Sequence, residues 1–185
     1  LKLRKYPYDE YKKIFDIYFV HGKFEQKLVQ KKFSSKLTHI IGYPRYSNLK
    51  DDKYLKGSIE KDFKLDKQKK LIYWTPTNVD NHGEKFSNIL LWIDKISKLQ
   101  NEYNIIIRPH PKTLMLEPNL EFNLKEKNFF IDKDQNRKIG EIFQISDLII
   151  SDYGGTVFSA IFFCKPIILL NLKHNSKFVS ELKYL

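Results

Sequence analysis

The chain has 185 residues, which is enough for one domain of ordinary size around a single core. Its 33 Lys and Arg residues outnumber its 22 Asp and Glu residues, so the formal net charge of +11 favours acidic partners such as a nucleotide, an anionic polymer or an anionic lipid surface. The basic residues are scattered between strands, without a one-sided helical stripe or an aromatic RNA-binding strand, which disfavours nucleic acid as the partner.

The first fifty residues predict a strand over 15–20, a helix over 23–33 and a second strand over 38–41. We expect residues 1–50 to form the end of an N-terminal half and its connection to the next domain. Residues 51–70 are polar and rich in lysine, which predicts a mobile linker.

Residues 71–185 predict a Rossmann-like α/β domain, in which a parallel sheet carries helices on both faces, because strand and helix patterns alternate along them. A helix over 85–100 has apolar residues at helical spacing. The expected elements of this part are strands over 71–74, 104–107 and 129–132, helices over 85–100 and 139–145, and an irregular stretch over 115–128.

Residues 147–171 predict a phosphate-binding strand–turn–helix–strand unit. A buried strand over 148–150 runs into the turn Ser151-Asp152-Tyr153-Gly154-Gly155-Thr156, which is followed by a helix over 156–164 and a strand over 165–172. Free N–H groups at the start of the helix would favour an anion at the carboxyl end of the strand. The alternative is an ordinary connection between a strand and a helix.

A second strand end strengthens the anion-binding interpretation. The strand over 104–107 leads directly into Arg108-Pro109-His110-Pro111-Lys112, where the prolines end the strand and stiffen the loop. Carboxyl ends of parallel strands share one edge, so these cations and the imidazole are expected to face the same crevice as the glycine turn. Arginine suits phosphate oxygens, and histidine holds or passes a proton near neutral pH. The alternative is a solvated strand end.

Four segments, in this order, resemble the CDP-glycerol glycerophosphotransferase family of teichoic acid and capsule synthesis. Residues 42–45 are similar to its G-Y-P-R segment, and residues 74–77 to its Y-A-P-T strand end with Trp in place of Tyr. Residues 108–111 are similar to its K/R-x-H-P loop, and residues 151–153 open its T-D-Y-S-S turn.

The resemblance implies the nucleotide-binding, C-terminal half of a GT-B-type transferase that moves glycerophosphate from CDP-glycerol onto a cell-surface polymer without a cofactor. His110 would be the catalytic residue, and the Gly154–Thr156 amides would hold the diphosphate. The residues implied in donor binding are Arg108, Lys112, Ser151, Asp152, Gly154, Gly155, Thr156, Thr75 and Thr77.

The chain departs from the family pattern at the turn. Gly154 and Gly155 stand where the family has two serines, and Ser159 stands where it has an aspartate, so amides remain but hydroxyl donors are lost. Another nucleotide-activated donor therefore stays open, as in a nucleotide-sugar glycosyltransferase or a UDP-sugar 2-epimerase, and so does a purely binding role. His21 is interpreted as a strand-end residue, and the acceptor-activating base is expected outside this chain.

The resemblance implies a bacterial protein that is cytoplasmic and peripheral at the inner face of the plasma membrane, and the single cysteine fits a reducing cytoplasm. Cys164 is the single cysteine and is expected to be a small buried hydrophobe. Asp132 and Asp134 are interpreted as solvated or helix-capping, and no metal is expected. No apolar run is long enough to span a membrane. Since Leu1 is not methionine, we expect a piece of a longer protein, with its last domain truncated.

Overall fold

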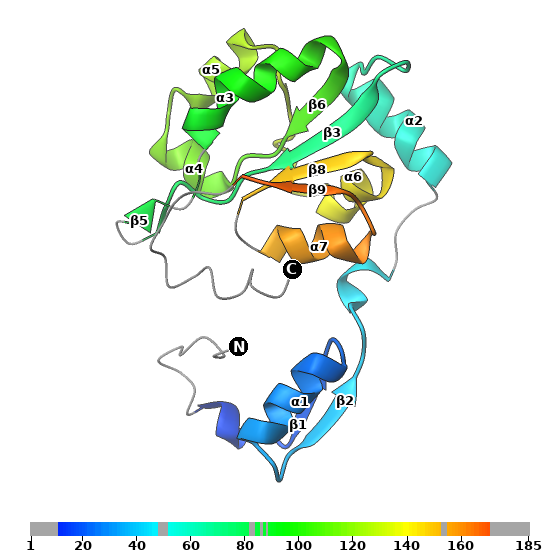
Figure 1. Cartoon of the computed structure of the whole chain (residues 1–185), viewed down its shortest axis with the longest axis vertical. Coiled ribbons are helices and arrows are strands. Elements are labelled where there is room, and N and C mark those ends of the chain that lie inside the picture. Colours follow the sequence, from blue (N-terminus) through cyan, green and yellow to red (C-terminus); the bar gives the residue numbers. More distant parts are fainter. Residues whose placement is uncertain are drawn as a thin grey trace. The chain divides into compact units, whose positions relative to one another are not determined.

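The computed structural model describes residues 11–47, 52–81, 84–85, 87, 89–152 and 155–170. The chain divides into two compact units. Unit 1 takes in the described residues 11–47, and unit 2 takes in those from 52 to 170. Each unit has its own sheet (Figure 1).

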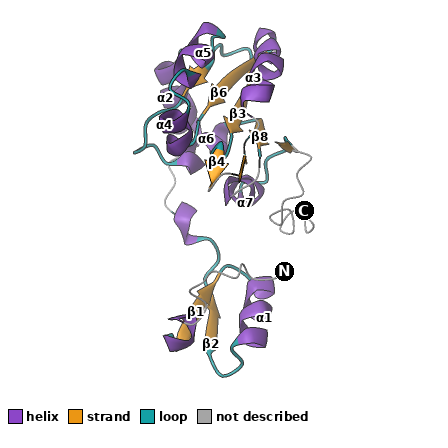
Figure 2. Ribbon diagram, turned by 90° about the vertical axis from the view of Figure 1, so that its left-hand side faces the viewer, coloured by secondary structure: helices purple, strands orange, loops and turns teal. Residues whose placement is uncertain are grey.

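Unit 1 is a strand, a helix and a second, parallel strand, as the sequence predicted. Ile17 on the first strand lies opposite Leu37 on the second, and the helix lies alongside both (Figure 2). Val29 of the helix and Val20 of the first strand are buried between them. The elements are η1 (Tyr11–Ile14), β1 (Ile17–Val20), α1 (Lys23–Lys32), β2 (Leu37–Ile40) and η2 (Pro44–Tyr46).

Unit 2 contains a five-stranded parallel sheet in the order β7-β6-β3-β8-β9. The strands are β3 (Lys70–Thr75), β6 (Tyr103–Ile107), β7 (Phe130–Ile131), β8 (Leu148–Ser151) and β9 (Ile167–Leu169), and a small hairpin joins β4 (Asp80–Asn81) to β5 (Glu84–Lys85). The chain moves outward from β3 to β7 and then returns to the other side of β3, so the strand order reverses between β3 and β8. Such a reversal is the usual place for a ligand in this fold.

Helices cover both faces of this sheet, which confirms the predicted Rossmann-like class. The helices are α2 (Asp52–Phe63), α3 (Ile89–Ser97), η3 (Lys98–Asn101), α4 (Pro111–Leu116), α5 (Leu120–Glu126), α6 (Ile139–Ile145) and α7 (Gly155–Phe162). Side chains alternate along β3: Ile72 and Trp74 pack with α3 and α5, whereas Leu71 and Tyr73 pack with α2, α6 and α7. Figure 1 shows the two layers on opposite sides of the strands.

Two stretches that the sequence predicted as non-regular are helical. The linker prediction for 51–70 is wrong over α2, because Leu55 and Ile59, one turn apart, bury an apolar stripe that packs with α6. The irregular stretch predicted for 115–128 contains the end of α4 and all of α5, whose Leu120 and Leu124 are buried in the same way. A narrow apolar stripe is therefore enough to stabilise a polar helix when the stripe packs into the core beside the sheet.

Two smaller expectations also differ from the structure. The helix expected over 85–100 begins only at Ile89, after the β5 segment, and Leu90 and Leu99 of its apolar stripe are exposed. Cys164 is exposed rather than buried, because it lies just past the end of α7 in a left-handed conformation, with φ of 51°. Among the described residues, no helix is long and apolar enough to cross a membrane.

Candidate functional site

The carboxyl edge of the unit 2 sheet brings together residues from four strands. Thr75 and Ser151 are register partners at the ends of β3 and β8. The Arg108 amide donates to the carbonyl of Trp74 at 2.9 Å, and the Asp132 amide donates to that of Ile107 at 2.8 Å, so both residues directly follow their strands at the same edge. The parallel sheet therefore places the predicted arginine loop and the strand end that leads into the glycine turn at one edge of the unit 2 sheet.

Three predicted binding hydroxyls form a small network at this edge. The Ser151 hydroxyl donates to the carbonyl of Thr75 at 3.1 Å and lies 3.4 Å from the Thr75 hydroxyl and 3.2 Å from that of Thr156. Thr75 and Ser151 are buried, whereas Thr156 is half-buried at the start of α7. The network fixes the first turn of α7 against the sheet, and Thr156 is its member nearest to solvent.

The turn between β8 and α7 is partly described. Asp152 is buried, and its Oδ2 accepts a 2.6 Å hydrogen bond from the hydroxyl of Ser87, which in turn accepts the amide of Ile89 at the start of α3. Gly155 begins α7, is exposed, and would meet only open space with a side chain. Gly154, which was predicted to bind the donor, and its neighbour Tyr153 lie outside the described residues. The helix start thus lies against a firmly held strand end.

His110, the predicted catalytic residue, is the N-cap of α4. Its Nδ1 accepts the Lys112 amide at 3.1 Å, so the proton of the neutral ring lies on Nε2. Lys112 is exposed, and His110 is exposed over part of its surface. Partial burial and the nearby Lys112 charge lower the pKa of His110 from its usual value of 6.5. The hydroxyl of the predicted rim residue Thr77 donates to the side chain of its neighbour Asn78 at 3.3 Å.

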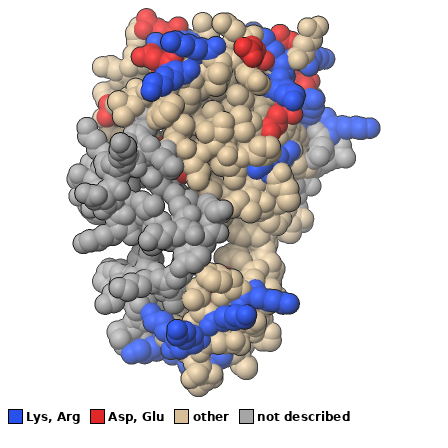
Figure 3. All heavy atoms as spheres, in the orientation of Figure 1, with Lys and Arg blue, Asp and Glu red and all other residues tan. Residues whose placement is uncertain are grey.

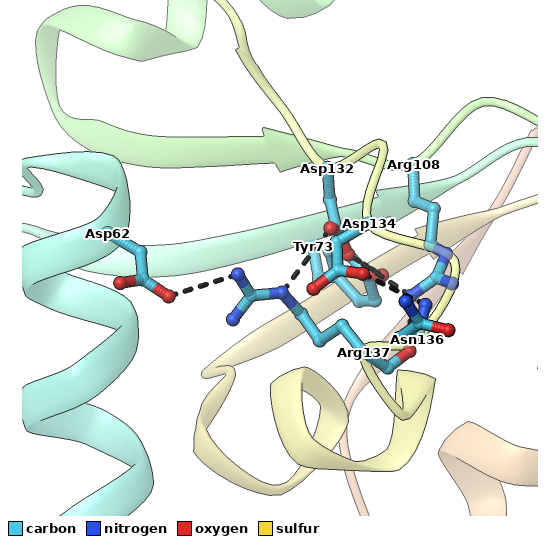
Figure 4. Close-up of polar contacts among 7 residues, drawn as sticks. All are labelled: Asp62, Tyr73, Arg108, Asp132, Asp134, Asn136 and Arg137. Carbon is cyan, nitrogen blue, oxygen red and sulfur yellow. Dashed lines mark hydrogen bonds and ion pairs between the residues drawn. The ribbon is translucent and has the colours of Figure 1, made fainter.

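Arg108 lies in a polar cluster at this edge, which Figure 4 shows together with the neighbouring loop residues. Its Nη1 donates to Asp132 Oδ2 at 3.2 Å and to the carbonyl of Arg137 at 3.0 Å. The Tyr73 hydroxyl donates to the same Asp132 oxygen at 3.2 Å. Arg137 Nε forms an ion pair with Asp132 Oδ1 at 3.4 Å, and its Nη2 bonds Asp62 of α2 at 3.0 Å.

The interpretation of Asp132 as solvated or helix-capping is therefore wrong, because its side chain is 1% exposed and bridges two arginines. Burial raises the pKa of Asp132 more than the arginines lower it, and burial together with Asp132 raises the pKa of Tyr73. The signal that could have revealed this role was the position of Asp132 in the sequence. Asp132 follows a strand neighbouring that of Arg108, just as the other edge residues follow theirs. Arg137 and Asp62 had no comparable signal.

Two other sequence interpretations concern histidine and metal. His21 directly follows β1 in unit 1, where its Nδ1 lies 2.9 Å from Glu25 and its ring lies 5.0 Å from that of Tyr43. Within the part of the chain that the structure describes, no group of three or more His, Cys, Asp or Glu residues is arranged to hold a metal ion. The candidate site therefore consists of cations, hydroxyls and amides at the sheet edge of unit 2.

Comparison with known proteins identifies relatives with this architecture. The teichoic acid poly(glycerol phosphate) polymerase of Bacillus spizizenii is 31% identical over 156 residues, covering 78% of this chain and 38% of that protein. The teichoic acid ribitol-phosphate polymerase TarK of Staphylococcus aureus is 27% identical over 134 residues, covering 69% of this chain and 26% of the relative. The chain thus spans well under half the length of these curated relatives.

Solved structures agree on the fold. The wall teichoic acid polymerase TagF matches with a TM-score of 0.60 and 25% identity, covering 83% of this chain and 38% of that one. The UDP-GlcNAc 2-epimerase of Neisseria meningitidis matches with a TM-score of 0.52 and 21% identity, covering 80% of this chain and 42% of that enzyme, which is a likeness of fold alone. The GT-B-type class expected from sequence is confirmed.

The family comparison covers most of the chain. The family described as CDP-glycerol:poly(glycerophosphate) glycerophosphotransferase matches residues 5–174, which include the described residues of both units and every edge residue of the candidate site. This agrees with the four segments whose order resembled that family. The chain therefore belongs to the CDP-glycerol:poly(glycerophosphate) glycerophosphotransferase family.

Proposed function

We propose that this chain is the nucleotide-binding part of a transferase that moves a polyol phosphate, most simply glycerophosphate from CDP-glycerol, onto a teichoic acid or capsular polymer. The observation that supports the proposal is the shared sheet edge, because the Arg108 loop, Ser151 and the start of α7 all lie at the carboxyl ends of strands, on both sides of the reversal of strand order. Cations and helix amides gathered there suit a diphosphate. Family membership supports the same donor class.

In the proposed reaction, an acceptor hydroxyl attacks the phosphorus that carries the polyol. A new phosphate ester bond forms, the phosphoanhydride bond breaks, and CMP leaves with the bonding electrons. Arg108 and the α7 amides from Gly155 onward would stabilise the negative charge on the phosphates. His110 would donate its Nε2 hydrogen to a phosphate oxygen, because its Nδ1 accepts the Lys112 amide. We assign the hydroxyl's proton to a base outside this chain.

The identity of the polyol and the nucleotide is part of the proposal. Relatives are named as both glycerol-phosphate and ribitol-phosphate polymerases, so CDP-ribitol is a donor of the same class. The alternative is a nucleotide-sugar glycosyltransferase or UDP-sugar 2-epimerase, in which a sugar carbon is attacked and UDP leaves intact. The glycines at 154 and 155, in place of serines, keep that alternative open.

We further propose a cytoplasmic protein that is peripheral at the inner face of the bacterial plasma membrane. Lys23, Lys27 and Lys31 lie one turn apart on α1 and are exposed, and Figure 3 shows lysine and arginine gathered over the face of unit 1 that it displays. Such a row attracts anionic lipid at about 1 kcal/mol per lysine near the surface. The polymer acceptor would reach the site from that surface.

The domain assignment belongs to the same proposal. Residues 1–50 would end an N-terminal half and connect it to the next domain, and residues 71–185 would form the nucleotide-binding domain. α2 joins that domain rather than the connection, because its Ile59 and Phe63 pack in the core of unit 2.

The experiment that tests the function is calorimetric titration of this chain with CDP-glycerol, CDP-ribitol, CMP, UDP and UDP-N-acetylglucosamine. We expect CDP-polyols to bind and Arg108→Ala to weaken them about tenfold or more, because a charge-assisted hydrogen bond contributes about 1.5–3 kcal/mol. Lys70→Ala, which removes an exposed cation from the opposite end of β3, is the matched control and should change affinity less than about twofold.

His110→Ala is expected to weaken CDP-polyol binding as well, through loss of the Nε2 donor. Preference for the UDP ligands would favour the glycosyltransferase alternative. Absence of binding by every ligand, or equal losses in Arg108→Ala and Lys70→Ala, would count against the proposed site.

A further inference from the structure

The Arg108 guanidinium is held through one nitrogen. Within the described part of the chain, its hydrogen bonds to Asp132 Oδ2 and to the Arg137 carbonyl both start at Nη1. These two acceptors use the two N–H bonds of that nitrogen. The N–H groups of Nε and Nη2 are then the donors left for a ligand, and the side chain is 19% exposed, so it reaches solvent. The two hydrogen bonds therefore orient the guanidinium and leave its Nε and Nη2 donors for a ligand.

Asp132 is itself held by two hydrogen bonds at its Oδ2 and by an ion pair at its Oδ1. It follows β7, its side chain is 1% exposed, and its Oδ2 accepts the Tyr73 hydroxyl as well as Arg108. Its Oδ1 faces Arg137 Nε at 3.4 Å. A buried carboxylate is tolerated when it is paired and hydrogen-bonded in this way. Figure 4 shows the two arginines on either side of the carboxylate, with Tyr73 beside it.

The loop that supplies the second acceptor is also anchored. Arg137 donates to Asp62 of α2 at 3.0 Å, and its backbone carbonyl is the one that Arg108 contacts. Asp134 Oδ1 accepts the amide of Asn136 at 2.9 Å, which shapes the same loop. The loop that carries Arg137 is therefore held at both its side chain and its backbone, and Arg108 is the member of the cluster that lies in the loop next to His110.

We infer that Asp132 is the positioning residue of Arg108, which it holds with the Arg137 carbonyl so that the Nε and Nη2 donors face the diphosphate of the donor. This inference rests on the proposed function, since it names what orders the phosphate-binding arginine. Asp132 does not touch the ligand. Arginine loses rotational freedom on binding, and a side chain already held in place loses less.

The first measurement needs no ligand. Nitrogen-15 NMR of the arginine side chains in the whole chain reports rotation of the Arg108 guanidinium, assigned by comparison with Arg108→Lys. We expect slow rotation in the wild type and at least about tenfold faster rotation in Asp132→Asn, because the amide keeps the shape but loses the charge-assisted bond. Glu102→Gln, which removes an exposed carboxylate just before the start of β6, at the opposite end of that strand from Arg108, is the matched control and should leave the rotation unchanged.

The second measurement is a double-mutant cycle in CDP-glycerol binding. Asp132→Asn should weaken binding about tenfold when Arg108 is present and less than twofold in an Arg108→Ala background. A merely structural role would give equal losses in both backgrounds, together with a lowered melting temperature. If Asp132→Asn does not fold, Tyr73→Phe removes the other hydrogen bond to the same oxygen and should weaken binding about threefold, again only with Arg108 present.

The outcomes separate this inference from the proposed function. Free rotation of the Arg108 guanidinium in the wild type, or the same rotation rate in the wild type and in Asp132→Asn, overturns the inference even if CDP-glycerol binds. Restraint of Arg108 by Asp132 without binding of any CDP-polyol overturns both the proposed function and the presentation of Arg108 to a diphosphate.

Discussion

The contacts of His110 favour the neutral form of its ring. Its Nδ1 accepts the Lys112 amide, which a protonated ring could not do, and partial burial and the Lys112 charge both oppose protonation. The folded residue therefore binds its proton at lower pH than the unfolded one. Between the two pKa values the unfolded state holds more protons, so stability rises with pH across this window, whose upper limit is near 6.5.

Lys112→Gln should raise the pKa of His110 toward its usual value without passing it, because the contribution of burial remains. Titration of the ring Cε1–H signal by NMR measures this directly. Lys70→Gln, at the opposite sheet edge, serves as the control and should leave the pKa where it is. An unchanged pKa in Lys112→Gln would mean that burial alone sets it, and His110 would then respond to bound phosphate more weakly than proposed.

Three helices of unit 2 end with the same backbone device. After α2, α5 and α7 a residue adopts a left-handed conformation, and the amide of the following residue bonds to a carbonyl five positions back. These are Schellman ends, which satisfy the last carbonyls of a helix and favour glycine or asparagine at the left-handed position. The residues found there are Lys64, Asn128 and Cys164, with φ of 52°, 58° and 51°.

Cys164→Gly is therefore expected to stabilise unit 2 by about 0.5–1 kcal/mol, since relief of the left-handed strain exceeds the added freedom of the unfolded chain. Urea unfolding followed by circular dichroism measures the change. Asn128→Gly is the matched comparison and should differ little from wild type, because asparagine already tolerates this conformation. A loss of stability in Cys164→Gly would show that its thiol packs favourably despite its exposure.

Elements with strong local patterns could be predicted from the sequence, and those stabilised by distant partners could not. The helix expected over 139–145 matches α6, and the apolar runs over 71–74 and 104–107 match most of β3 and β6. α2 was missed because its apolar stripe is narrow and interrupted by Gly57, and only packing with α6 shows that it suffices. α5 was missed for the same reason.

The candidate site followed the same rule. The positions of Arg108 and Ser151 at the sheet edge were predictable because each directly follows a strand pattern, and parallel strands bring such positions to one edge, whereas Thr75 was implied by the family resemblance. Asp132 was misinterpreted because a carboxylate after a strand is usually solvated, and only the folded chain shows two arginines around it. Arg137 lies in a loop with no periodicity, so no local pattern could predict its contact with Asp62.

The division of the whole molecule into two units has a thermodynamic consequence. The proposed donor site lies at one sheet edge of unit 2, and its described side chains all come from that unit. A ligand that binds only the folded form stabilises the unit that contains its site by an amount set by its concentration relative to Kd, about 2.7 kcal/mol at one hundred times Kd. Unit 1 should gain no stability from the ligand if its strands unfold independently of unit 2.

Hydrogen exchange read by mass spectrometry tests this in the whole chain. With CDP-glycerol at one hundred times Kd, the slowest amides of β3, β6 and β8 should exchange about one hundredfold more slowly, the equivalent of that stabilisation. Amides of β1 and β2 should exchange at their ligand-free rate, and Arg108→Ala should need correspondingly more ligand for the same protection. Protection of β1 and β2 to the same degree would show that the two units unfold together, and protection confined to them would move the donor site to unit 1.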